Sequence, residues 1–202
     1  MTAPARTRTV APAWPLYLAA FAIAAVVAGA VGEAFSGGSL AELGIPDPGA
    51  ATTVGLPALR GVAWLLMALA TGSFLLSAFL IPPKQTHQDL NGARLTVDGH
   101  LASRTGAHAS AGIALIGLAM IPLVLSDVSG QPLKTVLFEA AAWSQALDQV
   151  ADARVWLIVA VFAAVVAAFG YAASSWWSQV WLFVGAIVVV MPIALTGHSA
   201  TG

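Results

Sequence analysis

The stretch VWLIVAVFAAVVAAFGYAASSWWSQVWLFVGAIVVVMPIAL, residues 155–195, decides the fold of this chain. It contains no Asp, Glu, Lys or Arg. A bilayer core of about 30 Å needs about 20 apolar residues per helix, so this stretch is long enough for two crossings. Because only the short segment SSWWSQ separates the two apolar halves, we predict membrane helices over residues 155–173 and 176–196, joined as a tight antiparallel hairpin.

Three further apolar segments have the same character, at residues 14–35, 59–81 and 107–126. In the whole chain, 59% of the residues are hydrophobic and 8% are charged, whereas soluble domains are about 25% charged. The first segment is too long for the apolar region of a signal peptide, which favours a retained anchor. We therefore predict an all-α integral membrane protein, a single domain over residues 1–202 with five transmembrane helices.

The composition also argues against several classes of function. A net charge of −1 argues against nucleic acid as a partner, and the absence of cysteine excludes disulfides and thiolate metal sites. A b-type haem would need facing histidines, but His108 and His198 are expected at opposite faces of the membrane. Since the sequence also lacks a phosphate loop, a nucleophile triad and paired catalytic carboxylates, it does not indicate an enzyme.

The placement of basic residues predicts the orientation. Five lie on the side of the N-terminus (Arg6, Arg8, Lys84, Arg94 and Arg104) and three on the other side (Arg60, Lys134 and Arg154). Cytoplasmic loops carry the excess of Lys and Arg. We therefore expect a multi-pass protein of the cytoplasmic membrane with its N-terminus inside and its C-terminus outside, and with Trp64 and Trp156 at the outer interface.

Two connections should lie on the outer side. The segment GGSLAELGIPDPGAATTVG, residues 37–55, holds several turn formers and predicts an ordered, non-helical loop. Residues 131–154 have apolar positions at helical spacing, which predicts one extracytoplasmic interfacial helix between the third and fourth spans. The side chains expected to be buried there are Leu133, Leu137, Trp143 and Leu147.

Three methionines form the candidate metal site. Met67, Met120 and Met191 each lie seven residues from a polar residue on the outward side, which is Arg60, Asp127 and His198 respectively. Seven residues make about two helical turns, so we expect all three thioethers at one depth below the outer rim. Thioether and imidazole ligands suit Cu(I). The alternative is that the methionines only fill gaps in the core.

Three segments resemble a known family: LGIPDPGAATTVGLPALRGVAWLLMALATGSFLLSAFLIPP (43–83), PLVLSDVSGQPL (122–133) and PIALTGHSATG (192–202). They resemble the N-terminal region of actinobacterial copper resistance D family membrane proteins, in which this part is commonly fused to a cytochrome c oxidase assembly-like part. The resemblance implies His198, and more weakly Asp127, as copper contacts. Family members continue into further helices, so the resemblance implies that the chain is the first part of a longer protein.

The leading hypothesis is membrane copper transport or copper delivery. The protein would take copper, as Cu(I) that is not permanently bound, from the extracytoplasmic side. The resemblance extends this role to copper homeostasis and to haem–copper oxidase assembly, with the oxidase or its assembly factors as partners. The alternative is a non-transporting assembly or structural subunit that binds a respiratory-complex partner. Gly29 and Gly32, with Ala25 and Ala28, give the first helix a small-residue face suited to such a contact.

Overall fold

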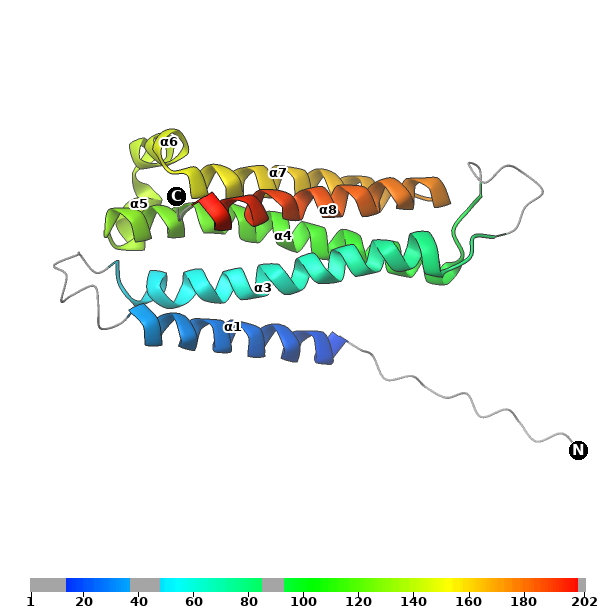
Figure 1. The fold of residues 1–202 in the computed structure, drawn as a ribbon, viewed down its shortest axis with the longest axis horizontal. Helices are drawn as coiled ribbons and strands as arrows, with labels where there is room; N and C mark the ends of the chain where they lie inside the picture. The colour runs from blue at the N-terminus through cyan, green and yellow to red at the C-terminus, as the bar shows by residue number, and fades with distance from the viewer. Residues whose placement is uncertain (1–13, 37–47, 85–92, 200–202) are drawn as a thin grey trace, which may run out of the picture.

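The computed structural model describes residues 14–36, 48–84 and 93–199. Five helices in these ranges are long and apolar enough to cross a membrane: α1 (Trp14–Ser36), α3 (Ala50–Leu75) with its π-helical continuation η1 (Leu76–Leu80), α4 (Val97–Ser129), α7 (Ala151–Ala172) and α8 (Trp176–Ser199). They lie side by side in an elongated bundle (Figure 1). The predicted class, an all-α membrane protein with five spanning helices, is confirmed.

The bundle has two distinct ends (Figure 1). Two short helices, α5 (Leu133–Phe138) and α6 (Ala140–Gln149), lie at one end, which we call the α5–α6 end. The connections from η1 to α4 and from α7 to α8 lie at the other, which we call the Arg94 end. Here an isolated antiparallel bridge pairs Arg94 with Ser175.

Helix α4 packs between α3 and α7, and α3 in turn packs against α1 and α8. Helix α4 is the most buried of the five spans, whereas α1 is the least buried and packs against α3. Small residues permit these close approaches. A Cβ atom on Gly117 of α4 would lie 2.9 Å from Ala160 Cβ and 3.0 Å from the Trp156 carbonyl oxygen of α7. Only glycine therefore fits at this crossing without a shift of the backbone.

Three spans are longer than predicted at their N-terminal ends, and one of them is α7, which begins at Ala151 rather than at residue 155. Helix α3 begins at Ala50 rather than at residue 59, directly after Gly49 with a φ of 90°. The predicted non-helical loop over residues 37–55 is therefore wrong for residues 50–55. Helix α4 begins at Val97 rather than at residue 107, and the Thr96 hydroxyl accepts a hydrogen bond from Gly99 N. The added segments of α3 and α4 contain polar residues. A search for long apolar stretches therefore does not include them.

The predicted single interfacial helix over residues 131–154 is wrong. The chain leaves helical geometry at Glu139, which separates α5 from α6, and residues 151–154 form the first turn of α7. Val136 is the buried anchor of this region, with 1% of its surface exposed, whereas Leu137 is 44% exposed. The prediction that Leu137 is buried is therefore wrong. Trp143 is partly buried and packs against the core together with Leu133. The sequence predicted that this region does not cross the membrane, and neither short helix is long enough to do so.

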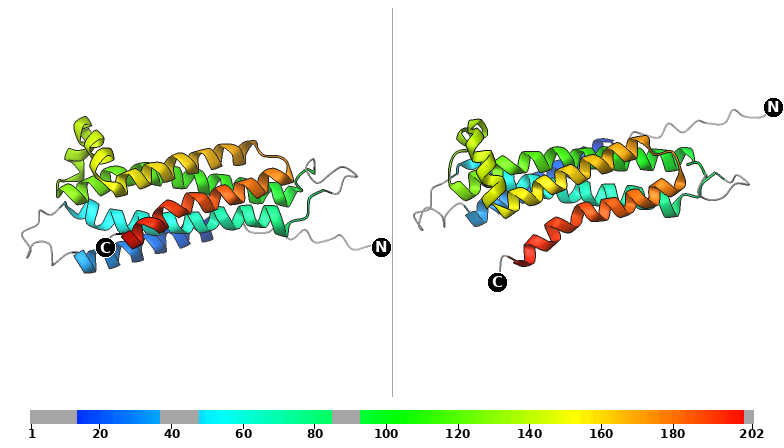
Figure 2. Two further views of the ribbon diagram at one scale, coloured as in Figure 1. Left: turned by 45° about the horizontal axis from the view of Figure 1, so that its top comes forward. Right: turned by 90° about the horizontal axis from the view of Figure 1, so that it is seen from above.

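Two features of α7 and α8 complete the fold. Trp156, predicted at the outer interface, is 4% exposed and belongs to the core, because it lies on the face of α7 that packs against α4. Helix α8 continues through Pro192 to Ser199. Its C-terminal part diverges from the other helices (Figure 2).

Candidate functional site

The five residues predicted to bind metal occupy different environments. Met120 is fully buried and Met67 is 2% exposed, and both belong to the hydrophobic core. Met191 is 51% exposed on α8. Asp127 is exposed near the C-terminal end of α4. His198 lies on the last turn of α8, and its side chain is outside the described residues. The structure thus brings two thioethers into the interior.

The depth of these two methionines follows from the register between α3 and α4. Three contacts fit one antiparallel alignment: Thr52 with Ser126, Gly55 with Leu123, and Leu66 with Gly112. In this register Met120 is level with Ala58, and Met67 is level with Ala111. The two methionines are therefore nine residues, about 13 Å, apart along the bundle axis.

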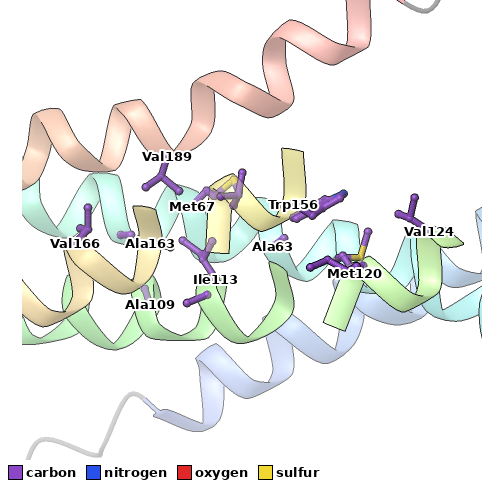
Figure 3. Close-up of a cluster of buried hydrophobic side chains, with 14 of the residues drawn as sticks. Ala63, Met67, Ala109, Ile113, Met120, Val124, Trp156, Ala163, Val166 and Val189 are labelled. Carbon is purple, nitrogen blue, oxygen red and sulfur yellow. The ribbon is translucent and has the colours of Figure 1, made fainter. Parts of the chain in front are cut away.

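The expectation of a single methionine layer is therefore wrong for Met67 and Met120. Figure 3 shows Met67 beside Val189 and Ile113, and Met120 farther along the bundle near Trp156. The error arose because the second span was predicted to begin at residue 59, close to Arg60. Since α3 begins at Ala50 instead, Arg60 and Met67 both lie deeper than that prediction implied.

Met67 lines a hollow of about 360 Å³ between α3 and α8. Trp64 and Thr71 flank it on α3, and Ile187 and Val190 close it from α8. Met191 follows Val190 directly, so its backbone is at about the level of Met67. The sequence alone could not reveal this hollow, because it depends on where α8 meets α3.

Polar contacts close the α5–α6 end around Ser126. The Ser126 hydroxyl donates to the Gln131 carbonyl oxygen at 2.6 Å. Since a serine hydroxyl has a single proton, the Thr52 hydroxyl is the donor in the 2.7 Å bond to Ser126 Oγ. Both hydroxyl side chains are fully buried. This pair holds α3, α4 and the start of the α5 connection together.

One ion pair lies on the flank of the bundle, at about the level of Met120. Arg60 Nη2 of α3 is 2.9 Å from Asp152 Oδ2 of α7, and each side chain is 42% exposed. Each side chain compensates the charge of the other at a level where α3 and α7 lie within the bundle. In the described part of the chain, His, Asp and Glu side chains form no group of three that could hold a metal ion.

The sequence interpretation missed a polar region in the half of the bundle near the Arg94 end. Gln179 of α8 and Ser103 of α4 are fully buried. Within the described part of the chain, the Gln179 amide atoms and Ser103 Oγ have no hydrogen-bond partner. Ser77 of η1, also fully buried, donates to the Gly99 carbonyl oxygen at 2.8 Å. A glutamine in an otherwise apolar helix was the available signal, but SSWWSQ was interpreted as a turn.

Five apolar helices around a buried core define the chain as a multi-pass helical membrane protein. Residues 50–202 match the family described as copper resistance protein D-like, N-terminal domain, and the chain belongs to this family. The match covers α3 to the end of the chain and leaves out α1. No curated protein and no solved structure matches the chain. The resemblance seen in the sequence is confirmed for this domain, and membership associates the protein with copper resistance.

Proposed function

We propose that this protein transports or delivers copper at the cytoplasmic membrane and takes Cu(I) from the extracytoplasmic side. Two buried thioethers, at separate levels of the interior of a copper resistance family member, are the observation that carries the proposal. Thioether ligands bind Cu(I) in preference to harder cations. In this orientation the α5–α6 end faces outward, as the distribution of Lys and Arg favours.

The proposed path has successive levels instead of one layer. His198 and Asp127 receive the ion near the α5–α6 end. Met120 forms the next level, six residues below Ser126, or about 9 Å along the axis. Met67 and Met191 form a third level beside the hollow between α3 and α8, where Met191 must turn inward to contribute. Because each level offers one or two ligands and Cu(I) prefers more, copper would be held loosely and passed on.

The downstream role is supported by the resemblance, which points to copper supply for haem–copper oxidase in actinobacteria. The competing proposal remains a non-transporting assembly subunit that binds a respiratory-complex partner. The small-residue face of α1 gives it less support than the sequence suggested, because that face packs inside the protein. A Cβ atom on Gly29 would lie 3.0 Å from Val54 Cγ1, and one on Gly61 would lie 3.0 Å from Ala28 Cβ.

Copper uptake into proteoliposomes that contain a Cu(I) chelator tests the proposal. The variants Met67→Leu and Met120→Leu conserve volume, so we expect them to fold while uptake falls about tenfold for each lost ligand. Leu66→Met, a swap in the opposite direction on α3, is the control and should leave uptake unchanged. His198→Ala should also lower uptake, whereas His108→Ala, whose exposed ring packs against Tyr171 of α7, should not. Wild-type uptake in both methionine variants would overturn the path, and no uptake by the wild type would favour the assembly subunit.

A further inference from the structure

The Arg94 end carries a hollow that the copper proposal does not use. Its volume is about 460 Å³, and three basic side chains line it: Lys84, Arg94 and His100. Arg104, one turn beyond His100, donates from Nε to His100 Nε2 at 3.4 Å and adds another positive charge beside it. The hollow therefore favours an anionic group.

Backbone hydrogen bonds connect the segments that line the hollow. Lys84 N donates to the Arg94 carbonyl oxygen at 3.0 Å, Leu95 N to the Ser174 carbonyl oxygen at 3.3 Å, and Trp176 N to the Ala93 carbonyl oxygen at 2.9 Å. The Trp176 indole also donates to the Ala78 carbonyl oxygen at 2.7 Å. These bonds join the end of η1, the segment before α4 and the α7–α8 turn. The basic side chains thus project from a connected main-chain frame.

The remaining walls of the hollow are amphiphilic. Thr96 and Ser174 add hydroxyl-bearing residues to the lining, and Val97 and Leu101 add apolar side chains that are 70% and 61% exposed. Val97 and Leu101 lie on the first turns of α4, where the helix enters the bundle. A free inorganic anion gains no favourable contact from these apolar side chains. A phospholipid, by contrast, presents a phosphodiester to the basic side chains and acyl chains to the apolar ones. Basic pockets at the ends of membrane helices are known to bind such headgroups.

We propose that this hollow binds the headgroup of an anionic phospholipid, with Lys84, Arg94 and His100 around the phosphodiester and Val97 and Leu101 against the glycerol and upper acyl chains. The site is separate from the copper path, which begins at the opposite end of the bundle. A bound lipid would link the segment after η1, the start of α4 and the α7–α8 turn, and would thereby stabilise the fold.

The test measures the thermal stability of the full chain in neutral detergent with added phosphatidylglycerol, with phosphatidylcholine of the same acyl chains, or with inorganic phosphate. We expect phosphatidylglycerol alone to raise the midpoint. Arg94→Gln and Lys84→Gln should each weaken its apparent affinity about fivefold. Arg154→Gln, the same charge change at the α5–α6 end, is the matched control and should have no effect. Leu101→Gln should weaken lipid binding through the apolar wall.

Three outcomes would overturn the proposal. Equal stabilisation by the two lipids would remove the role of the headgroup charge. Equal losses in Arg94→Gln and Arg154→Gln would show that only net charge matters. A shift reproduced by inorganic phosphate and unaffected by Leu101→Gln would assign the hollow to a soluble anion instead of a lipid.

Discussion

Thr52 of α3 and Ser126 of α4 share a buried hydrogen bond of 2.7 Å between residues 74 positions apart in the chain. This bond belongs to the same alignment as the contacts of Gly55 with Leu123 and of Leu66 with Gly112. This alignment gives the position of every residue of α3 relative to α4 along the bundle axis. It therefore also gives the positions of the two buried methionines.

Loss of this bond should destabilise the fold by an amount that depends on which partner is changed. Ser126→Ala leaves both the Thr52 hydroxyl and the Gln131 carbonyl without their partner, so we expect a loss of about 2 kcal/mol. Thr52→Val removes one donor and keeps the bond from Ser126 to Gln131, so about 1 kcal/mol is expected. Equilibrium unfolding in detergent mixtures measures both, with the exposed Thr135→Val as control. A larger loss in Thr52→Val than in Ser126→Ala would contradict this assignment of donor and acceptor.

The crossing of α4 and α7 at Gly117 should not tolerate a methyl group. Gly117→Ala would place its Cβ atom against backbone and Cβ atoms of α7, and such overpacking costs about 1–3 kcal/mol. Gly72→Ala in α3 is the matched control, because a Cβ atom there meets nothing within 4 Å. That variant should be neutral or more stable by up to about 1 kcal/mol, since alanine has the higher helix propensity. Thermal unfolding compares the two, and equal stability would argue against the close crossing.

Replacement of Gln179 by leucine should stabilise the protein. The amide is fully buried, and within the described residues neither of its polar atoms has a hydrogen-bond partner. An unpaired buried amide costs about 1–3 kcal/mol, and leucine has a similar volume. The same unfolding assay gives the sign, with the exposed Gln149→Leu expected within about 0.5 kcal/mol of the wild type. Destabilisation by Gln179→Leu would show that the amide binds a partner such as an internal water.

The orientation of the bundle can be tested by labelling, because the chain has no cysteine of its own. Ser144→Cys on α6 and Asp98→Cys at the start of α4 place exposed thiols at opposite ends of the bundle. We expect an impermeant thiol reagent outside intact cells to label the first and spare the second, as the distribution of Lys and Arg favours. The reverse pattern would place the proposed entrance for copper on the cytoplasmic side.

The hydropathy of the sequence was sufficient to predict five spans, because a helix in lipid must satisfy its backbone polar groups internally and present apolar side chains for about 20 residues. The same criterion missed the first turns of α3 and α4. Helices extend beyond the hydrocarbon as long as a cap such as Thr96 and good tertiary packing support them, and hydropathy does not register polar turns. The sequence by itself also determined the candidate soft ligands, since it contains Met and His but no Cys.

Only the tertiary structure decided how these ligands lie relative to one another. The height of Met67 against Met120 depends on the register of α3 with α4, which arises from contacts between residues far apart in the chain, such as Thr52 with Ser126. The burial of Trp156, and the break at Glu139 that exposes Leu137, likewise depend on which helix packs against which. Apolar side chains suit lipid and protein interior equally well, so their identity cannot distinguish the two environments. Close packing between helices makes that distinction.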